Sequence, residues 1–515
     1  MRDFLQKFEP LLRLANGPAP LPSTFGMAQS LFVRGIGAIY LIAIASWWVQ
    51  LDGLVGSNGI APVQSFIPAV KQNLGDSAFW KLPTVFLWNA SNPALHWTCL
   101  LGVISAVLVM AGVLQGPFLA LLWFLYLSLV NTGSVFMSFQ WDILLLEAGF
   151  LSLLVAPWRL WTGPRTVDPA VSRWGIFLVH FLLWKLMIFS GAVKIASDPT
   201  WRDGTALMHH YETQPIAHAV AWYAHQLPGW VHIVSSWIML AIEIVLPFGI
   251  FLGRRLRFVA FVGIVGLMIL IMATGNFTYF NLLTIVLCLS LIDDSCWPGK
   301  IRNRFQERSL SSAKFPRRAG FGIRLAIGAL LFVLSLQVCQ RQLIHEAKWV
   351  KKPFLPEFLN GLNGPAQPFH LSSGYGLFRV MTRERPEIII EGSHDGITWK
   401  SYDFRWKPDQ LGERPKLVAP HQPRMDWQLW FAALGYQYQR SSRTVWFENL
   451  MVRLLQDSPE VIRLFKSNPF PDQPPKFVRA KLYRYEFTSP GERKSTGNWW
   501  KRQDLGLFFP PISLR

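Results

Sequence analysis

Long apolar runs recur through the first two thirds of the chain. A run of about 20 residues is long enough to cross the roughly 30 Å hydrocarbon core of a bilayer as a helix. The pattern therefore predicts an α-helical polytopic membrane protein with about nine spans. We expect them at Leu31–Val49, His96–Leu114, Phe118–Phe136, Trp141–Trp158, Trp174–Lys194, Trp230–Leu252, Leu256–Thr274, Phe277–Ile292 and Phe321–Cys339.

The composition agrees with a membrane location and argues against nucleic-acid binding. Charged residues make up 16% of the 515 residues, whereas soluble domains carry about 25%. The 24 tryptophans fit the aromatic belts that form at membrane interfaces. The formal charge is +19, but the basic clusters lie between spans and accompany no nucleic-acid motif. The positive-inside rule explains them, and we expect membrane lipid, not nucleic acid, as a partner.

The order of apolar and polar stretches divides the chain into three parts. Residues 1–30 form a polar N-terminal segment, residues 31–340 a transmembrane bundle, and residues 345–515 a C-terminal soluble domain. Threading nine spans places the basic clusters, including the inner linker 298–320, on one side. The segment 195–229 and the C-terminal domain then share the opposite, outer side, which is lumenal or periplasmic.

The C-terminal part alternates apolar and polar residues in a way typical of strands. Two such runs flank Asp395-Gly396, a hairpin signal, and a third strand is predicted over 478–488. Helices are predicted over 427–434, 445–455 and 459–465. We therefore expect an α+β domain with a β-sandwich-like core.

Ionisable side chains inside the predicted spans require partners, because a charge at bilayer depth is costly. Comparing heights at about 1.5 Å per residue predicts two ion pairs between the fourth and fifth spans, Asp142–Lys194 and Glu147–Lys185. Such pairs can simply fix the register of the bundle. Alternatively, a desolvated lysine can act as a base, and Lys194, with His180 and Asp142, is the catalytic candidate. For His180 alone, a hydrogen-bonded core histidine is the favoured interpretation.

The outer segment 195–229 gathers histidine, arginine, acidic and aromatic side chains between two spans. A connecting loop needs no such side chains, so we expect a structured site at the membrane face. The histidines lack the spacing of known metal motifs, and we expect neither a metal nor a cofactor. Packing and recognition of a partner polypeptide or lipid remain as alternatives. The candidate residues are Trp201, Arg202, Asp203, His209, His210, Tyr211, Glu212 and His225.

Several long strings in this sequence resemble the lipase maturation factor family, in order and over nearly the whole chain. They are GSNGI (56–60), QWDILLLEAGFL (140–151), FSGAVK (189–194), TWRDGTAL (200–207), HYETQP (210–215), WYAHQLP (222–228), TGNFTYFNLLT (274–284), RPEIIIEGS (385–393) and PHQPRMDWQLWF (420–431). The resemblance implies a chaperone-like maturation factor, without turnover, whose soluble domain engages a secreted lipase. Animal members sit in the endoplasmic reticulum, and the sequence is also compatible with a bacterial inner-membrane member.

The same resemblance directs attention to aromatic and basic side chains of the C-terminal domain as client-binding candidates. We expect Trp399, Arg424, Trp427 and Trp430 to be exposed there. A fainter similarity, confined to residues 191–204, links the chain to the transmembrane region of the vitamin K-dependent gamma-carboxylases. It implies the alternative function, a membrane enzyme that uses Lys194 as a base. The sequence does not indicate an oligomeric state.

Overall fold

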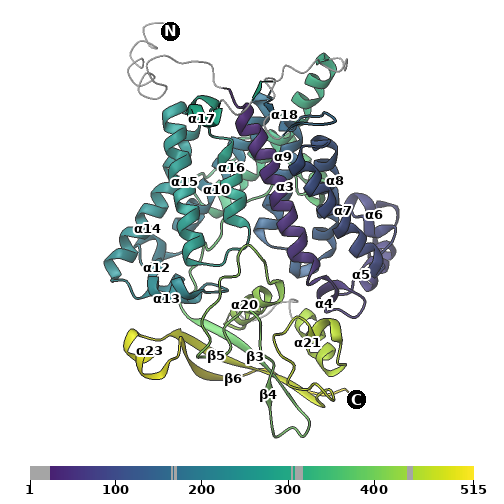
Figure 1. Ribbon diagram of the computed structural model, residues 1–515, viewed down its shortest axis with the longest axis vertical. Helices are drawn as coiled ribbons and strands as arrows, with labels where there is room; N and C mark the ends of the chain where they lie inside the picture. Colours follow the sequence, from purple (N-terminus) through teal and green to yellow (C-terminus); the bar gives the residue numbers. More distant parts are fainter. Residues whose placement is uncertain are drawn as a thin grey trace.

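The computed structural model describes residues 24–163, 166–167, 171–302, 306–307, 317–437 and 445–514. A bundle of long helices stands over a small β-sheet with its own short helices (Figure 1). Most of the predicted N-terminal segment 1–30 and of the basic linker 298–320 lies outside the described residues.

The predicted spans correspond to helices of the bundle. Within the described ranges, seven helices are long and apolar enough to cross a membrane. They include α3 (Gly26–Trp48), α7 (Asn92–Ala111), α8 (Gln115–Thr132), α10 (Arg173–Ser197), α14 (Gly229–Ile244), α15 (Arg254–Thr274) and α18 (Arg317–Arg341). Two shorter helices, α9 (Gln140–Val155) and α16 (Phe280–Leu289), occupy the predicted fourth and eighth spans. The chain is therefore a multi-pass membrane protein, as predicted.

Short helices cap the bundle on the side of the C-terminal domain. The loop after α3 contains α4 (Leu51–Val55), α5 (Val63–Leu74) and α6 (Ala78–Lys81), and the segment 195–229 contains α11 (Pro199–Arg202), α12 (Ala206–Thr213) and α13 (Ala219–His225). At the other end of the bundle lie α17 (Gly299–Arg302) and a small parallel pair of strands, β1 (Thr166–Val167) and β2 (Gln306–Glu307) (Figure 1).

Close helix contacts in the bundle rely on small residues. Helix α3 packs on α7, α8 and α9. Where α3 meets α9, the backbone of Gly149 lies directly under the hydroxyl of Tyr40, so that a Cβ atom at this position would collide with it. Small side chains let membrane helices approach to this distance. The Tyr40 hydroxyl donates to the carbonyl of Leu145 at 3.3 Å, which joins the two helices in the membrane interior.

The C-terminal domain is built on one antiparallel sheet in the strand order β4-β3-β5-β6. Its strands are β3 (Arg385–Ser393), β4 (Lys400–Ser401), β5 (Phe477–Phe487) and β6 (Trp500–Ile512), and its helices are α20 (Arg424–Gln437), α21 (Val445–Leu455), α22 (Pro459–Ile462) and α23 (Pro490–Thr496). The three predicted helices and the predicted α+β class are confirmed. Among the described residues, a single sheet covered by helices replaces the expected β-sandwich-like core.

The predicted hairpin turn is confirmed in detail. The Asp395 carboxylate accepts hydrogen bonds from the backbone N–H groups of Ile397 at 2.8 Å and Thr398 at 2.7 Å. Gly396 adopts a φ of +74°, a conformation that side chains with a Cβ rarely allow. These contacts return the chain from β3 to β4.

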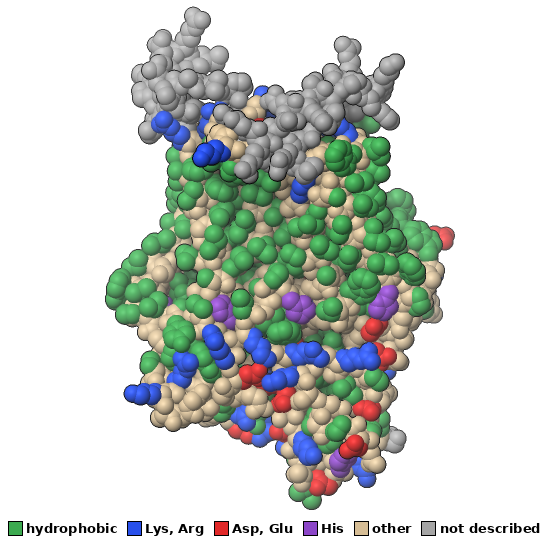
Figure 2. All heavy atoms as spheres, in the orientation of Figure 1, with side chains coloured by type: hydrophobic (Ala, Val, Ile, Leu, Met, Phe, Trp, Pro, Cys, Tyr) green, Lys and Arg blue, Asp and Glu red, His purple; other side chains and the backbone are tan. Residues whose placement is uncertain are grey.

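The bundle and the C-terminal domain share one hydrophobic core. A continuous cluster of buried side chains extends from Phe32 and Leu144 in the bundle to Met425 in α20 and to Ile388 and Leu482 in the sheet. The face drawn in Figure 2 carries a broad hydrophobic band over the helices, with charged side chains gathered below it on the C-terminal domain. The domain is therefore packed on the end of the bundle, next to the expected membrane surface.

Candidate functional site

The outer segment 195–229 lies between the bundle and the C-terminal domain and contacts both. Three tryptophan side chains cross this junction. The indole N–H groups donate to backbone carbonyls, from Trp201 to Phe378 at 2.9 Å, from Trp222 to Thr488 at 2.9 Å and from Trp430 to Thr213 at 3.0 Å. The segment and the domain consequently lie on the same side of the bundle, the arrangement that the sequence predicts.

Arg385, the first residue of β3, fastens the segment to the sheet. Its fully buried guanidinium donates to the carbonyls of Glu212 and Pro215, both at 2.8 Å, and to that of Gln214. Burying a charged group is costly unless it is paired and hydrogen-bonded. The backbone that follows α12 is therefore shaped around this arginine.

A carboxylate balances the charge of Arg385 inside the sheet. Glu387 lies 2.6 Å from the Arg385 guanidinium and 2.8 Å from the Lys407 ammonium. All three side chains are buried. Arg385 is not among the candidate residues of the sequence analysis. The one feature that could have identified it is its position, as a charged residue at the start of an isoleucine-rich strand.

Asn276, which follows α15, makes a second connection between the two parts. Its side-chain carbonyl accepts from the backbone N–H groups of Val418 at 2.7 Å and Ala419 at 3.0 Å, and its amide donates to the carbonyls of Ile216 and Lys416. One amide thus joins a span, the outer segment and the loop before α20. Sequence reasoning missed this role.

Asp142 forms the most deeply buried ion pair of the junction, and its partner is Arg424 of α20. The guanidinium contacts both carboxylate oxygens at 2.8 Å, and both side chains are fully buried. The hydroxyl groups of Tyr126 and Tyr279 also donate to Asp142, each at 2.5 Å. A residue of the C-terminal domain therefore neutralises a charge at the end of a membrane helix.

The predicted Asp142–Lys194 pair was wrong. Lys194 instead contacts Glu243 of α14, with its ammonium 2.5 Å and 2.8 Å from the two carboxylate oxygens, and lies over the ring of Trp201 at 5.3 Å. The height comparison paired only the fourth and fifth predicted spans. Lys194 instead contacts the next span, 49 residues further along the chain, and Asp142 contacts a helix of the C-terminal domain, 282 residues further along.

The catalytic candidates do not share one site. His180 bonds the carbonyl of Ser290 at 2.8 Å. It lies on the same helix as Lys194, and fourteen residues at 1.5 Å each place them about 21 Å apart along the axis. Asp142 is occupied by Arg424. Each of these groups therefore has a separate structural partner.

The second pair, Glu147–Lys185, is present at 2.5 Å and is buried. Residues that precede the sheet in the chain lie inside the bundle and provide the remaining hydrogen-bond partners of this ion pair. The Tyr375 hydroxyl donates to Glu147 at 2.6 Å, the backbone N–H of Ser373 donates at 3.0 Å, and the Lys185 ammonium contacts the Ser372 hydroxyl at 3.0 Å. The connection to the C-terminal domain is thus part of the bundle interior.

We expect Lys185→Met to reduce the amount of folded protein strongly. The change leaves the Glu147 carboxylate buried without its cation, which typically costs about 3–5 kcal/mol. The double variant Glu147→Gln/Lys185→Met removes both charges and should recover much of the loss. Thermal unfolding of the detergent-purified variants measures the difference. A double variant as unstable as the single one would show that the pair itself does not cause the loss.

The histidines of the outer segment occupy separate packed positions. His210 stacks on Phe277 with ring centres 6.0 Å apart and meets the edge of Phe378 at 5.2 Å. Its burial lowers its pKa to about 4, with a smaller effect from Lys194. His225 lies 3.7 Å from Glu212. Burial lowers the pKa of His225 to about 4 and raises that of Glu212.

The other candidates of the segment make local contacts. Arg202 donates to the carbonyl of Ile195 at 3.0 Å, and the Asp203 carboxylate accepts from the N–H of Thr205 at 2.9 Å. Burial lowers the pKa of His209, and the ring of Tyr211 lies 5.9 Å from that of His210. Within the described part of the chain, no three His, Cys, Asp or Glu side chains gather as a metal site would require.

We expect acidification from pH 7 to pH 5 to lower the unfolding temperature. The folded state holds the pKa of His210 at about 4, below the unfolded value near 6.5. The corresponding stability is therefore complete above pH 6.5 and is lost as the pH falls toward 4, on the order of 1–2 kcal/mol at pH 5. His225 acts in the same direction, and Glu212, with its raised pKa, acts in the opposite one.

The His210→Gln variant tests this assignment, because it keeps a polar side chain that does not titrate. Its unfolding temperature should depend less steeply on pH between 7 and 5 than that of the unmodified protein. If the unfolding temperatures of the two proteins depend equally on pH, His210 does not cause the loss of stability on acidification.

The predicted client-binding side chains are mostly not on the surface, which corrects that part of the sequence analysis. Arg424, Trp427 and Trp430 are buried at the junction, because α20 faces the bundle. Trp399, after the hairpin turn, is half-buried, and the Arg479 guanidinium covers its ring at 3.9 Å. Trp399 is thus the one member of this set that remains partly accessible.

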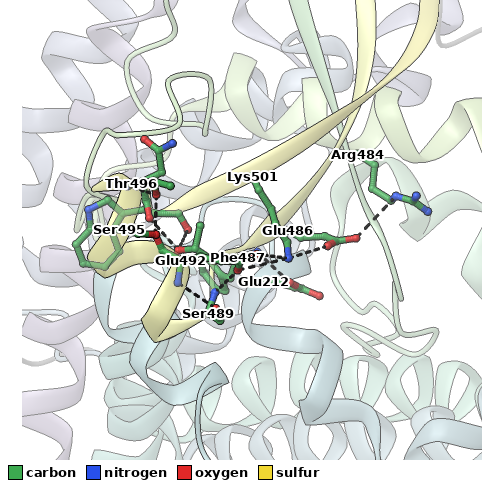
Figure 3. A network of polar contacts seen from close by, with 12 residues as sticks. Glu212, Arg484, Glu486, Phe487, Ser489, Glu492, Ser495, Thr496 and Lys501 are labelled. Carbon is green, nitrogen blue, oxygen red and sulfur yellow. Dashed lines mark hydrogen bonds and ion pairs between the residues drawn. The ribbon is translucent and has the colours of Figure 1, made fainter.

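Around Glu212, the segment meets a network of polar contacts on the sheet (Figure 3). The Glu212 carboxylate accepts from the backbone N–H of Phe487 at 3.2 Å. Next to it, the Lys501 ammonium lies 3.7 Å from Glu486 and 3.1 Å from Glu492. The Glu212 bond thus joins the outer segment to a polar network that β5, β6 and α23 form among themselves.

Comparisons with known proteins agree with this two-part organisation. Residues 27–299 match the model of the lipase maturation factor transmembrane domain, and residues 371–510 match that of the lipase maturation factor C-terminal domain. No solved structure matches the chain. The two matched regions correspond to the bundle and to the domain docked on it.

Relatives among curated proteins match along nearly the full length. Human lipase maturation factor 2 is 34% identical over 95% of this chain and 83% of its own length. The chicken (Gallus gallus) lipase maturation factor 2 is 35% identical, with 94% and 81% covered. Bovine (Bos taurus) lipase maturation factor 1 is 32% identical, with 97% and 91% covered. The chain belongs to the lipase maturation factor family.

Proposed function

We propose that this protein is a membrane-embedded maturation factor that brings secreted lipases to their active state. The observation that carries the proposal is the match to proteins named lipase maturation factor over both the bundle and the C-terminal domain. The proposal places the protein in a membrane where secreted proteins fold. That membrane is the endoplasmic reticulum in a eukaryote or the inner membrane in a bacterium.

The docked domain supports a binding role for the outer face. The buried Asp142–Arg424 pair, the hydrogen bonds of Arg385 to the outer segment and the shared core hold the C-terminal domain against the bundle, so that a client which binds the domain is kept at the membrane surface. A preorganised surface loses less conformational freedom on binding than a flexible one. In this role, the bundle positions the domain and the exposed side of the domain contacts the client.

Co-expression with a secreted lipase tests the proposal. In cells that lack their own maturation factor, the chain should raise the active fraction of the secreted lipase, measured as activity per amount of lipase protein. A matched secreted protein that is not a lipase serves as the control. Unchanged specific activity, with this chain present in the membrane at normal levels, would contradict the proposed function.

A variant of the accessible tryptophan examines the contribution of the domain surface. Trp399→Ala should leave the amount of membrane protein unchanged, because the ring is only half-buried. If the client docks near the β3–β4 hairpin, the variant lowers the active fraction of lipase. Full activity with Trp399→Ala would place client contacts elsewhere on the domain.

A further inference from the structure

An open hollow of about 660 Å³ lies between α13 of the outer segment and α23 of the C-terminal domain. Figure 1 shows the two helices on the same side of the molecule, with α13 near the lower end of α14. The hollow combines side chains from both parts of the chain. Its lining residues are Trp222, Tyr223, Gln226, Pro490, Arg493, Lys494 and Gly497.

Arg493 is the central cation of this hollow, and aromatic rings hold it in place. Its guanidinium carbon lies 3.5 Å from the ring centre of Trp499, 4.7 Å from that of Trp222 and 5.6 Å from that of Tyr223. It also donates to the Tyr223 hydroxyl at 3.3 Å. Stacking on ring faces fixes a guanidinium while its N–H edge stays available.

The cations of the hollow are not neutralised by acidic neighbours. Among the residues that the structure describes, neither Arg493 nor Lys494 forms an ion pair. The adjacent Glu492 is already occupied, since it caps its own helix through Ser489 and contacts Lys501 (Figure 3). A fixed guanidinium without a carboxylate partner is suited to an anion that arrives from outside, above all a phosphate.

The hollow lies next to a membrane span, and this position indicates which molecule supplies the phosphate. Gln226, which lines it, stands three residues before Gly229, the first residue of the span α14. On α14, Trp230 is 68% exposed, Trp237 48% and Ile238 55%, as expected for a surface that faces lipid. Aromatic side chains at the end of a span mark the level of the headgroups.

We propose that the hollow between α13 and α23 binds the phosphate headgroup of an anionic phospholipid. Arg493 provides a bidentate contact to the phosphate, Lys494 adds a second positive charge, and the Gln226 amide is within the same lining. From Gln226 the chain continues within three residues into α14, whose exposed apolar side chains accommodate the acyl chains. This continuity favours a phospholipid over an acidic peptide of a soluble partner. The bound lipid would tie the C-terminal domain to the membrane surface.

Lipid retention by the purified full chain tests the proposal. The detergent-solubilised protein is titrated with phosphatidylglycerol or phosphatidylcholine, and native mass spectrometry counts the lipid molecules bound. The unmodified protein should retain phosphatidylglycerol in preference to phosphatidylcholine. Because one basic side chain near a membrane surface contributes about 1 kcal/mol, Arg493→Gln should weaken phosphatidylglycerol retention about fivefold.

Arg463→Gln is the matched control, since Arg463 is an exposed arginine of the same domain that does not line the hollow. It should retain phosphatidylglycerol normally. If both variants lose phosphatidylglycerol retention equally, the effect depends only on the net charge of the domain, and the proposal is overturned. The proposal would also fail if Arg493→Gln retains phosphatidylglycerol normally but loses an acidic peptide that binds the unmodified chain. Lipid retention is measured without any lipase, so this result is independent of the proposed maturation activity.

Discussion

Replacement of Arg424 by methionine is expected to abolish the accumulation of folded protein. The substitution leaves the Asp142 carboxylate fully buried with only the hydroxyl groups of Tyr126 and Tyr279 as partners. Breaking a buried pair from one side typically costs about 3–5 kcal/mol, a large part of the roughly 5–15 kcal/mol by which proteins are stable. The amount of protein in the membrane and its unfolding temperature in detergent measure the effect.

The control for this experiment removes both charges. Asp142→Asn/Arg424→Met no longer buries an unpaired carboxylate, and the two tyrosines can still bond the amide. We expect it to regain a substantial part of the lost stability, as buried pairs replaced as a unit often do. Normal accumulation of the single variant Arg424→Met would contradict the assigned role of the pair.

Replacement of Arg385 by glutamine is expected to detach the outer segment from the sheet. The side chain makes three hydrogen bonds to backbone carbonyls in the last turn of α12 and directly after it, and bonds to a charged donor contribute about 1.5–3 kcal/mol each. The loss also leaves Glu387 with Lys407 as its remaining cation. Limited proteolysis should then cleave near residues 212–218, which the unmodified protein protects.

Arg484→Gln provides the comparison, because Arg484 lies on the neighbouring strand β5 and makes its ion pair with Glu384 at the surface. Exposed pairs contribute about 0–1 kcal/mol, so the proteolysis pattern should not change. Equal protection of residues 212–218 in the Arg385→Gln and Arg484→Gln variants would show that Arg385 does not hold the segment.

The spans and their order could be predicted from the sequence because each depends on local hydrophobicity. The Glu147–Lys185 pair could also be anticipated, since both residues lie on adjacent antiparallel helices at similar heights. The Asp142–Arg424 pair could not, because its cation comes from a helix 282 residues later in the chain. Comparing the positions of side chains along neighbouring spans gives no information about contacts with a domain that packs on the end of the bundle.

The same limit explains the errors in the C-terminal domain. Alternating residues predicted strands correctly, but one sheet covered by helices and by the bundle leaves the same pattern as two facing sheets. Arg424, Trp427 and Trp430 were expected at the surface because the family resemblance implies that the soluble domain engages a client. They do form an interface, but it is the internal one with the bundle.

We infer that the outer segment and the C-terminal domain lie together on one side of the membrane. Single cysteines can be placed at three exposed positions, Tyr223, Leu505 and Arg255, in a chain freed of its four native cysteines. A membrane-impermeant maleimide is then added to sealed vesicles of known orientation. We expect positions 223 and 505 to react from the same side and position 255 only from the other. Reaction of positions 223 and 505 from opposite sides would contradict it.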